Sequence, residues 1–350
     1  MHNKKRVALL ASGGVDSSVA LALLKEQNYD VEAFYLKIWL EDELAFLGDC
    51  PWQEDLDYLE KVCKQLKVKL NIVPMQKEYF DNVVSYTINE VKNGRTPNPD
   101  VMCNNHIKFG LFLDKVPENF DYIASGHYAQ TEKIGEFTYL KKAPDLIKDQ
   151  TYFLANLNKD ILPRILFPIG EYSKEEVRSL AEKFNLPNKD RRDSQGICFL
   201  GKLKFNEFLE HYLGKNIGNI VDIDTQETLG THNGFFYHTI GQRKGLGLSG
   251  GPYYVVSKDQ EQNIVYVSKN YFEKNKERKE FWIETPNLFG KELTEFKGLQ
   301  VKIRHGEKLY NCSLDKDKVT IDQNDQGIAP GQFAVFYSSD LCIGAAKIKK

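Results

Sequence analysis

The chain has 350 residues, of which 41% are apolar and 27% are charged, and its formal net charge is −2. This is the composition of a globular protein with two or three domains, and it disfavours indiscriminate binding to nucleic acid. No apolar run approaches the roughly 20 residues of a membrane span, and the first strand begins too early for a signal peptide, so we expect a cytoplasmic protein without a membrane partner. The six cysteines form no C-x-x-C pair, which disfavours a zinc or thioredoxin-type site.

The first strong signal is the segment Ser12–Ser18, S-G-G-V-D-S-S, between a predicted strand at 7–11 and a predicted helix. A glycine turn in this position lets the backbone approach phosphate oxygens, and the first amides of the helix point at the anion. The P-loop lysine is absent, so serine hydroxyls are the expected donors, and Asp16 is placed to hold Mg²⁺ against the phosphates. The alternative is a plain turn with Asp16 or Ser17 as the N-cap. The context favours nucleotide phosphate binding.

The first two hundred residues alternate predicted strands with predicted helices. We expect strands at 7–11, 31–36, 70–73 and 122–125, and helices at 19–24, 56–66, 80–91 and 107–113. Alternation of this kind implies a parallel sheet covered on both faces, with ligands beyond the carboxyl ends of its strands. The loops after Ala11, Leu36 and Ser125 should therefore meet at one rim.

The remaining chain is richer in short β segments. A helix is expected at 205–212 and strands at 253–256, 264–267, 281–283, 301–303, 319–321, 333–336 and 342–344. Residues 274–280 are charged and are expected to form a linker. The sequence thus predicts three domains, 1–202, 203–273 and 274–350. The segment Gly245–Gly250 matches the dinucleotide fingerprint G-x-G-x-x-G, but it precedes a strand, so we expect a loop of the β-rich part.

Two cysteines differ from the other four in their surroundings. Cys103 follows a loop stiffened by Pro97 and Pro99, and we expect it at the start of a helix near cations, where the pKa of a thiol falls. Asp100, three residues earlier, is placed to exchange a proton. Cys198 follows two arginines, and spacing alone does not show whether it meets Cys103. The cysteines expected to fill the core are Cys50, Cys63, Cys312 and Cys342.

Six motifs together resemble the tRNA-specific 2-thiouridylase family, which belongs to the ATP pyrophosphatase superfamily. The S-G-G-V-D-S-S heptad resembles the pyrophosphatase (PP) loop of that superfamily, which also includes GMP synthetase. The motifs keep the order of the family and cover nearly the whole chain: Ser12–Ser18, Asn98–Asn104, Gly126–Ala129, Lys148–Gln150, Ser194–Phe199 and Thr239–Gly247. The resemblance implies an α/β fold: a Rossmann-like, adenine nucleotide α-hydrolase type domain with a parallel sheet, followed by two small β-barrel domains.

The resemblance implies thiolation of the wobble uridine of tRNA with ATP and Mg²⁺. ATP would adenylate O2 of the base, so that AMP leaves in place of oxide and pyrophosphate departs into the PP loop. An upstream persulfide donor, a cysteine desulfurase or a sulfur-relay protein, would load Cys198. Cys103 would then release the sulfur and leave a Cys103–Cys198 disulfide. Direct attack of the persulfide on C2 and prior release of sulfide both stay open.

The resemblance also implies roles for single residues, with Asp100 as the acid–base candidate beside the target base. It places the ATP site at Leu10, Ala11, Ser12, Gly13, Gly14, Val15, Asp16, Ser17, Leu36 and Gly126. It places tRNA contacts at Asn98, Pro99, Asp100, His127, Lys148, Asp149, Gln150, Arg304, His305 and Gln332. The family often has methionine at position 36, where Leu36 keeps an apolar contact. It often has tyrosine at position 305, where His305 changes the contact but can still stack on a base.

Two other functions use part of this pattern. An ATP-dependent amidoligase similar to GMP synthetase would use the PP loop but would have no use for Cys103 and Cys198. An RNA-binding protein without catalysis should carry damage at Asp16, Cys103 or Cys198, and all three are intact. Ordinary structural or solvated roles are the alternatives for His127, Lys148, Arg243 and Lys244.

Overall fold

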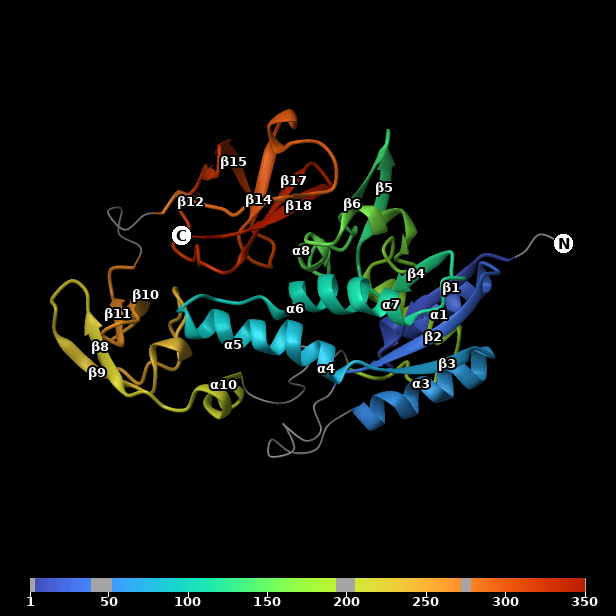
Figure 1. Ribbon diagram of the computed structural model, residues 1–350, viewed down its shortest axis with the longest axis horizontal. Helices are drawn as coiled ribbons and strands as arrows, with labels where there is room; N and C mark the ends of the chain where they lie inside the picture. Colours follow the sequence, from blue (N-terminus) through green and yellow to red (C-terminus); the bar gives the residue numbers. More distant parts are fainter. Residues whose placement is uncertain (1–3, 39–51, 193–204, 272–277, 350) are drawn as a thin grey trace.

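The computed structural model describes residues 4–38, 52–192, 205–271 and 278–349. Figure 1 shows the N-terminal sheet at one end of the long axis and strands β8 to β11 at the other, with the C-terminal strands between them. Helices α5 and α6 run along one side of the C-terminal strands and connect the two ends (Figure 1). Among these residues no helix combines the length and the apolar character that a bilayer crossing requires.

The N-terminal part is a parallel sheet of order β3-β2-β1-β4-β7. Its strands are β1 (Arg6–Leu10), β2 (Asp30–Lys37), β3 (Lys69–Pro74), β4 (Tyr122–Ser125) and β7 (Ile165–Leu166). Its α-helices are α1 (Val15–Glu26), α3 (Trp52–Leu66), α4 (Gln76–Tyr79), α5 (Ser85–Lys92), α6 (Pro99–Met102), α7 (Phe112–Lys115), α8 (Thr151–Leu154) and α9 (Lys174–Lys183). Phe80–Val84 and Cys103–Leu111 are π-helical, and Lys159–Arg164 is a 3₁₀ turn. The predicted α/β class is confirmed.

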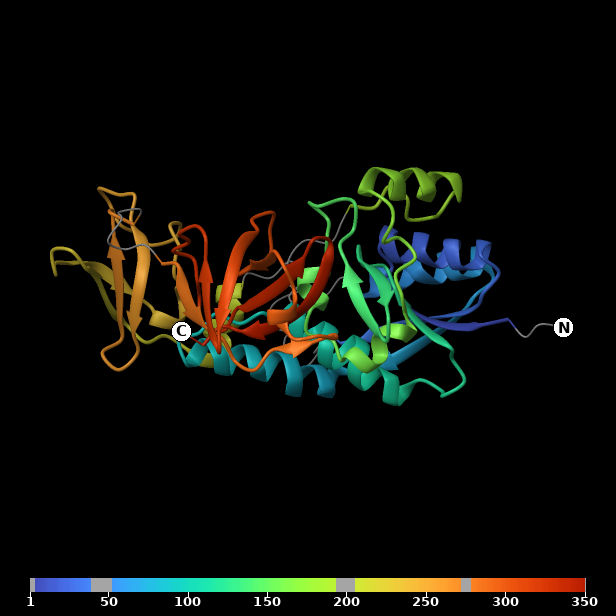
Figure 2. The ribbon, with the colours of Figure 1, turned by 90° about the horizontal axis from the view of Figure 1, so that it is seen from above.

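Helices cover both faces of this sheet because successive side chains of β1 point to opposite sides. Val7 and Leu9 are buried in one apolar cluster with residues of α1, α3 and α9. Ala8 and Leu10 are buried in a second cluster with residues of the helical segments between Gln76 and Lys115. Figure 2 shows α9 beyond α1, on the same side of the sheet. From Val7 to Leu10 the strand is apolar because neither face meets water there.

The predicted rim is confirmed by the register of the strands. Leu10, the last residue of β1, pairs with Phe34 of β2 on one side and with Ser125 of β4 on the other. The chain leaves β1 for β2 and later returns to the opposite side of β1 through β4, so the strand order reverses there. Ligands of open parallel sheets bind at such a reversal, beyond the carboxyl ends of the strands.

One helix begins earlier than expected. The helix predicted at 107–113 starts at Pro99 and continues through Cys103–Leu111 to Lys115. Asn98 caps it, since its side chain accepts a hydrogen bond of 3.2 Å from the amide of Val101, and Pro99 occupies the first helical position. Cys103 therefore lies one turn inside the helix. The prediction that it lies at the N-terminus was wrong.

The C-terminal strands form an antiparallel sheet that also recruits a hairpin from the N-terminal part. Its path is β12-β16-β15-β14-β17-β18-β6-β5, with β13 paired to β18. The strands are β5 (Gln130–Ile134), β6 (Phe137–Lys141), β12 (Glu280–Trp282), β13 (Asn287–Leu288), β14 (Leu299–Lys302), β15 (Tyr310–Asp315), β16 (Lys318–Ile321), β17 (Phe333–Ser338) and β18 (Leu341–Lys347), and Leu293–Glu295 is a 3₁₀ turn. The predicted linker 274–280 lies mostly outside the described residues, and Glu280 already belongs to β12. The β5–β6 hairpin had not been predicted.

A smaller sheet, of order β10-β11-β8-β9, lies between these two parts in the sequence. It consists of β8 (Gly218–Asp222), β9 (Thr228–His232), β10 (Tyr254–Asp259) and β11 (Ile264–Ser268), preceded by α10 (Phe205–Leu213) and interrupted by a 3₁₀ turn at Phe235–Tyr237. The predicted hairpin corresponds to β10 and β11. Residues 245–250 form a loop before β10. The G-x-G-x-x-G match therefore lacks the helix of a dinucleotide site, as predicted.

Two buried histidines should make the smaller sheet sensitive to acid. His232 and His238 are about 6% and 7% exposed, and their ring centroids are 5.4 Å apart. Burial, with His232 and Lys258 nearby, lowers the pKa of His238 to about 4. Below pH 6.5 the unfolded chain therefore binds a proton that the folded chain does not, so stability falls as the pH drops toward 4. We expect the free energy of unfolding to be smaller by roughly 2–3 kcal/mol at pH 4.5 than at pH 7 from this residue.

Urea unfolding at the two pH values tests this prediction. His238→Phe keeps an aromatic ring in place and should remove most of the difference. The matched control is His211→Phe, since His211 is exposed and should leave the difference unchanged. An unaltered pH dependence in His238→Phe would contradict the assignment.

Candidate active site

The Ser12–Ser18 loop leaves the start of α1 open. Gly14 is the N-cap, with an extended backbone (φ −75°, ψ 162°), and no side chain caps α1 within the described part of the chain. The N-cap alternative for Asp16 or Ser17 was therefore wrong. The Ser17 and Ser18 hydroxyls donate to the Gly14 carbonyl at 3.1 and 3.0 Å. These bonds fix the loop, and the first amides of α1 stay directed at the rim, where an anion is favoured.

Two glycines of the loop region stand where a side chain has no room. Gly13 has φ +76°, and a Cβ there would collide with the backbone carbonyl of Asp55. A Cβ on Gly126 would lie 2.8 Å from the Ser17 amide nitrogen. The segment after β4 therefore packs directly against the first turn of α1. Both contacts keep the backbone of the PP loop fixed without an intervening side chain.

Gly13→Ala should destabilise the protein more than an alanine at another left-handed glycine. Gly214 has φ +65° and open space around its Cβ position, so Gly214→Ala carries the backbone cost alone, about 1–2 kcal/mol. Gly13→Ala adds a collision with backbone and should cost at least about 3 kcal/mol. Urea unfolding without nucleotide measures both variants. Equal losses of unfolding free energy in the two variants would show that the backbone at Asp55 moves aside without cost.

Asp16 is held by two residues that the sequence analysis missed. One of its carboxylate oxygens accepts a hydrogen bond of 2.7 Å from the Lys174 ammonium, at the start of α9, and one of 2.9 Å from the Tyr128 hydroxyl. Ser173 and Glu176 form a capping box that fixes this end of α9. The S-x-x-E pattern was visible in the sequence, but nothing in it indicated contact with a residue 158 positions away.

The loop offers Mg²⁺ one carboxylate. No cluster of three or more histidine, cysteine, aspartate or glutamate side chains occurs in the described ranges. Mg²⁺ in proteins commonly uses one or two carboxylates together with substrate phosphates and water. Asp16 therefore fits a Mg²⁺ shared with a nucleotide but not a site built from protein ligands alone. Lys174 adds a cation at the same carboxylate.

The carbonyl side of the loop is also anchored. The Gly13 carbonyl accepts hydrogen bonds from Asn188 at 2.8 Å and from Arg191 at 3.1 Å. Arg191 also pairs with Asp55, and Asn188 is almost fully buried. These contacts hold the carbonyl of Gly13 in place. Neither Asn188 nor Arg191 had been predicted.

The segment after β4 touches both the PP loop and the helix of Cys103. Gly126 and Tyr128 contact the loop as described, while the ring of His127 lies 6.2 Å from that of Phe109. The Ser125 hydroxyl is 2.7 Å from Nδ1 of His127. Burial, with a smaller effect of Lys108, holds the pKa of His127 well below its usual value. His127 is therefore neutral at pH 7.

The loop before Cys103 is fastened to the C-terminal sheet. The Gln332 amide donates to the carbonyls of Thr96 and Pro97 at 3.2 and 2.9 Å and accepts from Asn98 at 3.5 Å. The Thr96 amide donates to the Pro330 carbonyl at 2.8 Å. Gln332, predicted as a tRNA contact, thus fixes the loop that carries Asn98, and Asp100 follows on the first turn of α6.

Arg304 and His305 follow β14 and differ in their partners. The ring of His305 lies 4.5 Å from that of Phe153, tilted by 34°. Burial lowers the pKa of His305, and Asp100 is among the charges that act on it. Arg304 forms a two-point ion pair with Asp325, with contacts of 3.0 and 2.5 Å. The lowered pKa keeps His305 neutral at pH 7, and its ring lies against that of Phe153.

The predicted tRNA contacts at 148–150 lie in different environments. Asp149 is 1% exposed; its carboxylate accepts from the Thr151 hydroxyl at 2.8 Å and lies 3.6 Å from the Lys302 ammonium. The side-chain oxygen of Gln150 accepts a hydrogen bond of 2.9 Å from the backbone amide of Tyr128, and the backbone amide of Gln150 donates to the Tyr128 carbonyl. Gln150 therefore supports the segment after β4, whereas Asp149 is bound to Thr151 and Lys302. Lys148 is half-buried.

Of the four cysteines in the described residues, three are buried and Cys312 is half-buried. Cys103 is 1% exposed and lies on the helix that Asn98 caps. Cys198 and Cys50 lie outside the described residues. Cys63 and Cys342 are buried in the core as predicted, whereas Cys312 is half-buried. Burial raises the pKa of the Cys63 thiol to about 11 and that of Cys312 to about 12, so both stay protonated at neutral pH.

The remaining predicted ATP-site residues are backbone or core positions of the same rim. Leu10, Ala11 and Val15 are buried, and the Ala11 amide donates to the Phe34 carbonyl at 2.9 Å. Leu36 is half-buried near the end of β2. Ser12 bonds to Ser17 through its amide at 3.2 Å. The structure thus gathers the predicted ATP-site residues around one strand end.

Three family models match the chain in succession. They are described as a tRNA methyl transferase HUP domain (residues 5–202), a tRNA methyl transferase PRC-barrel domain (206–269) and an aminomethyltransferase beta-barrel domain (278–348). A curated protein of Parabacteroides distasonis, named tRNA-specific 2-thiouridylase MnmA, is 46% identical over 353 residues, with 98% of each chain covered. One of the same name from Porphyromonas gingivalis is 43% identical over 358 residues, covering 98% of this chain and 99% of its own.

Solved structures are more distant. An NMN synthetase from Francisella tularensis matches 61% of this chain and 79% of its own, with 15% identity and a TM-score of 0.36. A 4-thiouridine synthetase in complex with RNA and ATP matches 59% of this chain and 50% of its own, with 13% identity and a TM-score of 0.34. TM-scores this low support no conclusion about function.

Proposed function

The chain belongs to the tRNA-specific 2-thiouridylase family, and from this membership we propose that it is a tRNA sulfurtransferase acting on the wobble uridine. In the proposed reaction ATP activates O2 of the base, and sulfur then replaces that oxygen. The products are 2-thiouridine in the tRNA, AMP and pyrophosphate. ATP is a substrate in this scheme.

The PP loop is proposed to bind the phosphates of ATP. The open start of α1 supplies amides, and Lys174 supplies a cation beside Asp16. A bound Mg²⁺ would offset phosphate charge as the bond between the α and β phosphates breaks. Asp16 would hold it, and Lys174 would move its ammonium from the carboxylate toward the phosphates. Developing negative charge on pyrophosphate would thus meet fixed positive charge.

The target uridine is proposed to enter beside Asp100. Its ring would leave the anticodon stack, which a single-stranded loop permits at low cost. Asn98 and Asp100 are held by the helix cap and by Gln332, so they offer a fixed edge to the base. The neutral ring of His305, which lies beside Phe153, is proposed to stack on the RNA. Asp100 would take the proton that the uridine loses when O2 attacks the α phosphate.

The sulfur step is proposed to use a persulfide on Cys198, loaded by an upstream persulfide donor. Either the terminal sulfur attacks C2 and AMP leaves, or Cys103 first displaces it as sulfide, which then attacks C2. In both routes the Cys103 thiolate bonds to the Cys198 sulfur, and the bond to the transferred sulfur breaks. The resulting disulfide needs two electrons from an external thiol to restart the cycle.

One observation supports joining these two steps in one site. The four residues from Ser125 to Tyr128 contact the first turn of α1 and Asp16 on one side and, through His127, Phe109 of the Cys103 helix on the other. Phe109 lies six positions after Cys103 on the same helix. The segment after β4 thus links the nucleotide loop to the helix that carries both Asp100 and the proposed sulfur-handling cysteine.

The test is a reconstituted thiolation assay. Purified protein, a tRNA transcript, ATP with Mg²⁺ and a sulfide source should give a tRNA that migrates slowly in a mercury-containing gel. Mass spectrometry of its nucleosides should identify 2-thiouridine. Thiolation without ATP, or ATP cleavage without any thiolated nucleoside, would overturn the proposal.

A further inference from the structure

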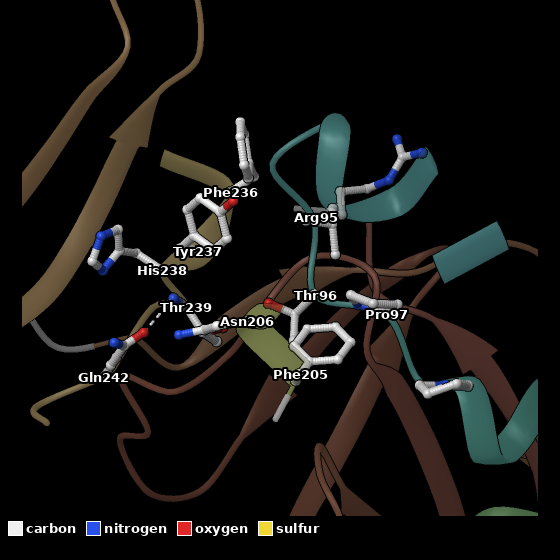
Figure 3. A pocket seen from close by; sticks show the side chains of 12 residues that line it. Arg95, Thr96, Pro97, Phe205, Asn206, Phe236, Tyr237, His238, Thr239 and Gln242 are labelled. Carbon is white, nitrogen blue, oxygen red and sulfur yellow. Dashed lines mark hydrogen bonds between the residues drawn. The ribbon is translucent and has the colours of Figure 1, made fainter. Parts of the chain in front are cut away.

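The motif Thr239–Gly247 has no role in the reaction proposed above, yet it borders a hollow beside the substrate loop. The hollow has a volume of about 310 Å³ and is lined by Thr96, Pro97 and Pro99 on one side and by Tyr237, His238, Thr239 and Gln242 on the other. Figure 3 shows Thr96 and Pro97 across from Tyr237, His238, Thr239 and Gln242, with Phe205 and Asn206 between them. Pro99 precedes Asp100 directly, so the hollow adjoins the proposed position of the target base.

We propose that this hollow binds a second nucleotide of the RNA, the one next to the target uridine on its 5′ or 3′ side. The inference rests on the proposed function. The nucleotide would place its base among the aromatic side chains and its phosphate at Arg243 and Lys244. Specificity for the sequence around the uridine would then reside partly in this hollow.

The walls suit an uncharged aromatic base. Phe205, Phe236 and Tyr237 contribute rings, and the Tyr237 hydroxyl is anchored by a hydrogen bond of 2.6 Å to the Gly214 carbonyl. The lining cation, Arg95, is neutralised by two hydrogen bonds to Glu90 of 2.7 and 2.9 Å. The interior is therefore aromatic and carries little net charge. Unstacked bases bind to such surfaces by stacking on the rings.

Hydrogen bonds hold the loop that carries Arg243 and Lys244, directly after the last residue that lines the hollow. The Gly241 amide donates to the Val255 carbonyl at 2.8 Å, and the Val255 amide donates to the Gln242 carbonyl at 3.0 Å. The Gln242 side chain accepts from the Thr239 amide and donates to the Lys244 carbonyl at 3.0 and 2.9 Å.

The cations themselves are Arg243 and Lys244. Both are exposed, and neither forms an ion pair with a carboxylate of the described residues. They follow directly after Gln242, which lines the hollow. An aromatic interior followed directly in the chain by two exposed cations suits the base and the phosphate of one nucleotide. A site for phosphate alone would not need the three rings.

Binding of synthetic anticodon stem–loops tests the proposal without requiring turnover. Three RNAs are compared by fluorescence anisotropy: the intact one and two with an abasic nucleotide directly 5′ or 3′ of the target uridine. The abasic RNA that lacks the base bound in the hollow should bind roughly 5- to 150-fold more weakly than the intact RNA. This is the range expected for loss of one stacked base. Phe236→Ala should weaken binding of the intact RNA similarly and leave binding of that abasic RNA unchanged.

Two further variants test the proposal independently in case Phe236→Ala does not fold. Asn206→Ala, at an exposed position in the first turn of α10, should reduce discrimination among the four bases at the sensitive position. Replacing both Arg243 and Lys244 by alanine should lower the slope of log Kd against log salt by roughly 1 to 2. Trp282→Ala removes an exposed aromatic ring outside the hollow and should change neither property.

Equal binding of all three RNAs, or the same loss for Phe236→Ala on intact and abasic RNA, would overturn the proposal. Failure of the proposed function gives a different result, because the wild-type protein would then neither thiolate nor selectively bind the intact stem–loop. Normal thiolation with insensitivity to both abasic sites would remove only the second nucleotide site.

Discussion

Cys103→Ser should abolish sulfur transfer while leaving the ATP-consuming half of the reaction in place. Serine keeps the shape of the side chain at a position that is 1% exposed, so the helix should fold normally. A hydroxyl cannot displace sulfur from a persulfide under these conditions, because only a thiolate is a sufficient nucleophile. We expect persulfide-dependent formation of 2-thiouridine to fall by roughly a thousandfold or more. Pyrophosphate release in the presence of tRNA should stay within about threefold of the wild type in a single turnover, because adenylation of the base expels pyrophosphate before sulfur attacks.

The matched control is Cys312→Ser. Cys312 is half-buried on β15, donates a weak hydrogen bond of 3.6 Å to the Leu299 carbonyl, and has a raised thiol pKa. It should support wild-type thiolation after the same replacement. Wild-type thiolation by Cys103→Ser, measured with a persulfide donor, would remove Cys103 from the sulfur step.

Asp16→Asn should slow ATP cleavage by roughly a hundred- to a thousandfold. The amide keeps the size of the side chain and the contact with the Tyr128 hydroxyl but removes the charge that the proposed Mg²⁺ needs. Lys174→Met should act differently, since it leaves the carboxylate and removes the cation proposed to meet the phosphates. We expect a higher KM for ATP in Lys174→Met and a lower kcat at saturating ATP and Mg²⁺ in Asp16→Asn. Release of AMP during tRNA-dependent turnover measures both.

Lys183→Met is the control for the lysine. Lys183 lies on the same helix as Lys174, pairs with Glu26 at 3.4 Å, and has a side chain that is 61% exposed. Its loss should leave both constants unchanged. An Asp16→Asn protein with wild-type kcat, or a Lys174→Met protein with wild-type KM, would contradict the role given to that residue.

The parts of the site that could be predicted are those formed by residues that are close together in the sequence. Strand β1, the glycine turn and α1 follow one another without interruption, so local propensity and the apolar pattern suffice to place them. The rim also followed from local patterns, because alternating strands and helices force the strand ends to one side. The cores around Cys63 and Cys342 were predictable for the same reason.

The parts that the sequence did not predict depend on contacts across the chain. Lys174 and Asn188 reach the PP loop only after the sheet has formed, and no local pattern relates them to it. The β5–β6 hairpin is polar on much of its surface and gains its place by pairing β6 with β18, which lies about two hundred residues later. Gln332 reaches Thr96 and Pro97 in the same way.

The start of the Cys103 helix could have been found. Asparagine followed by proline is a common beginning of a helix, with the amide side chain as cap and proline at the first position. Pro97 and Pro99 also indicate a stiff loop, and that interpretation placed the predicted start of the helix too far along the chain. Asn98 and Pro99 in fact begin the helix.

The destination of the uridine O2 atom tests the central claim most directly. A tRNA transcript carrying ¹⁸O at O2 of the target uridine is thiolated with ATP, and the released AMP and pyrophosphate are analysed by mass spectrometry. Activation of the base at O2 predicts one ¹⁸O atom in AMP for each 2-thiouridine formed, and none in pyrophosphate. Thiolation that yields unlabelled AMP would contradict adenylation of the base.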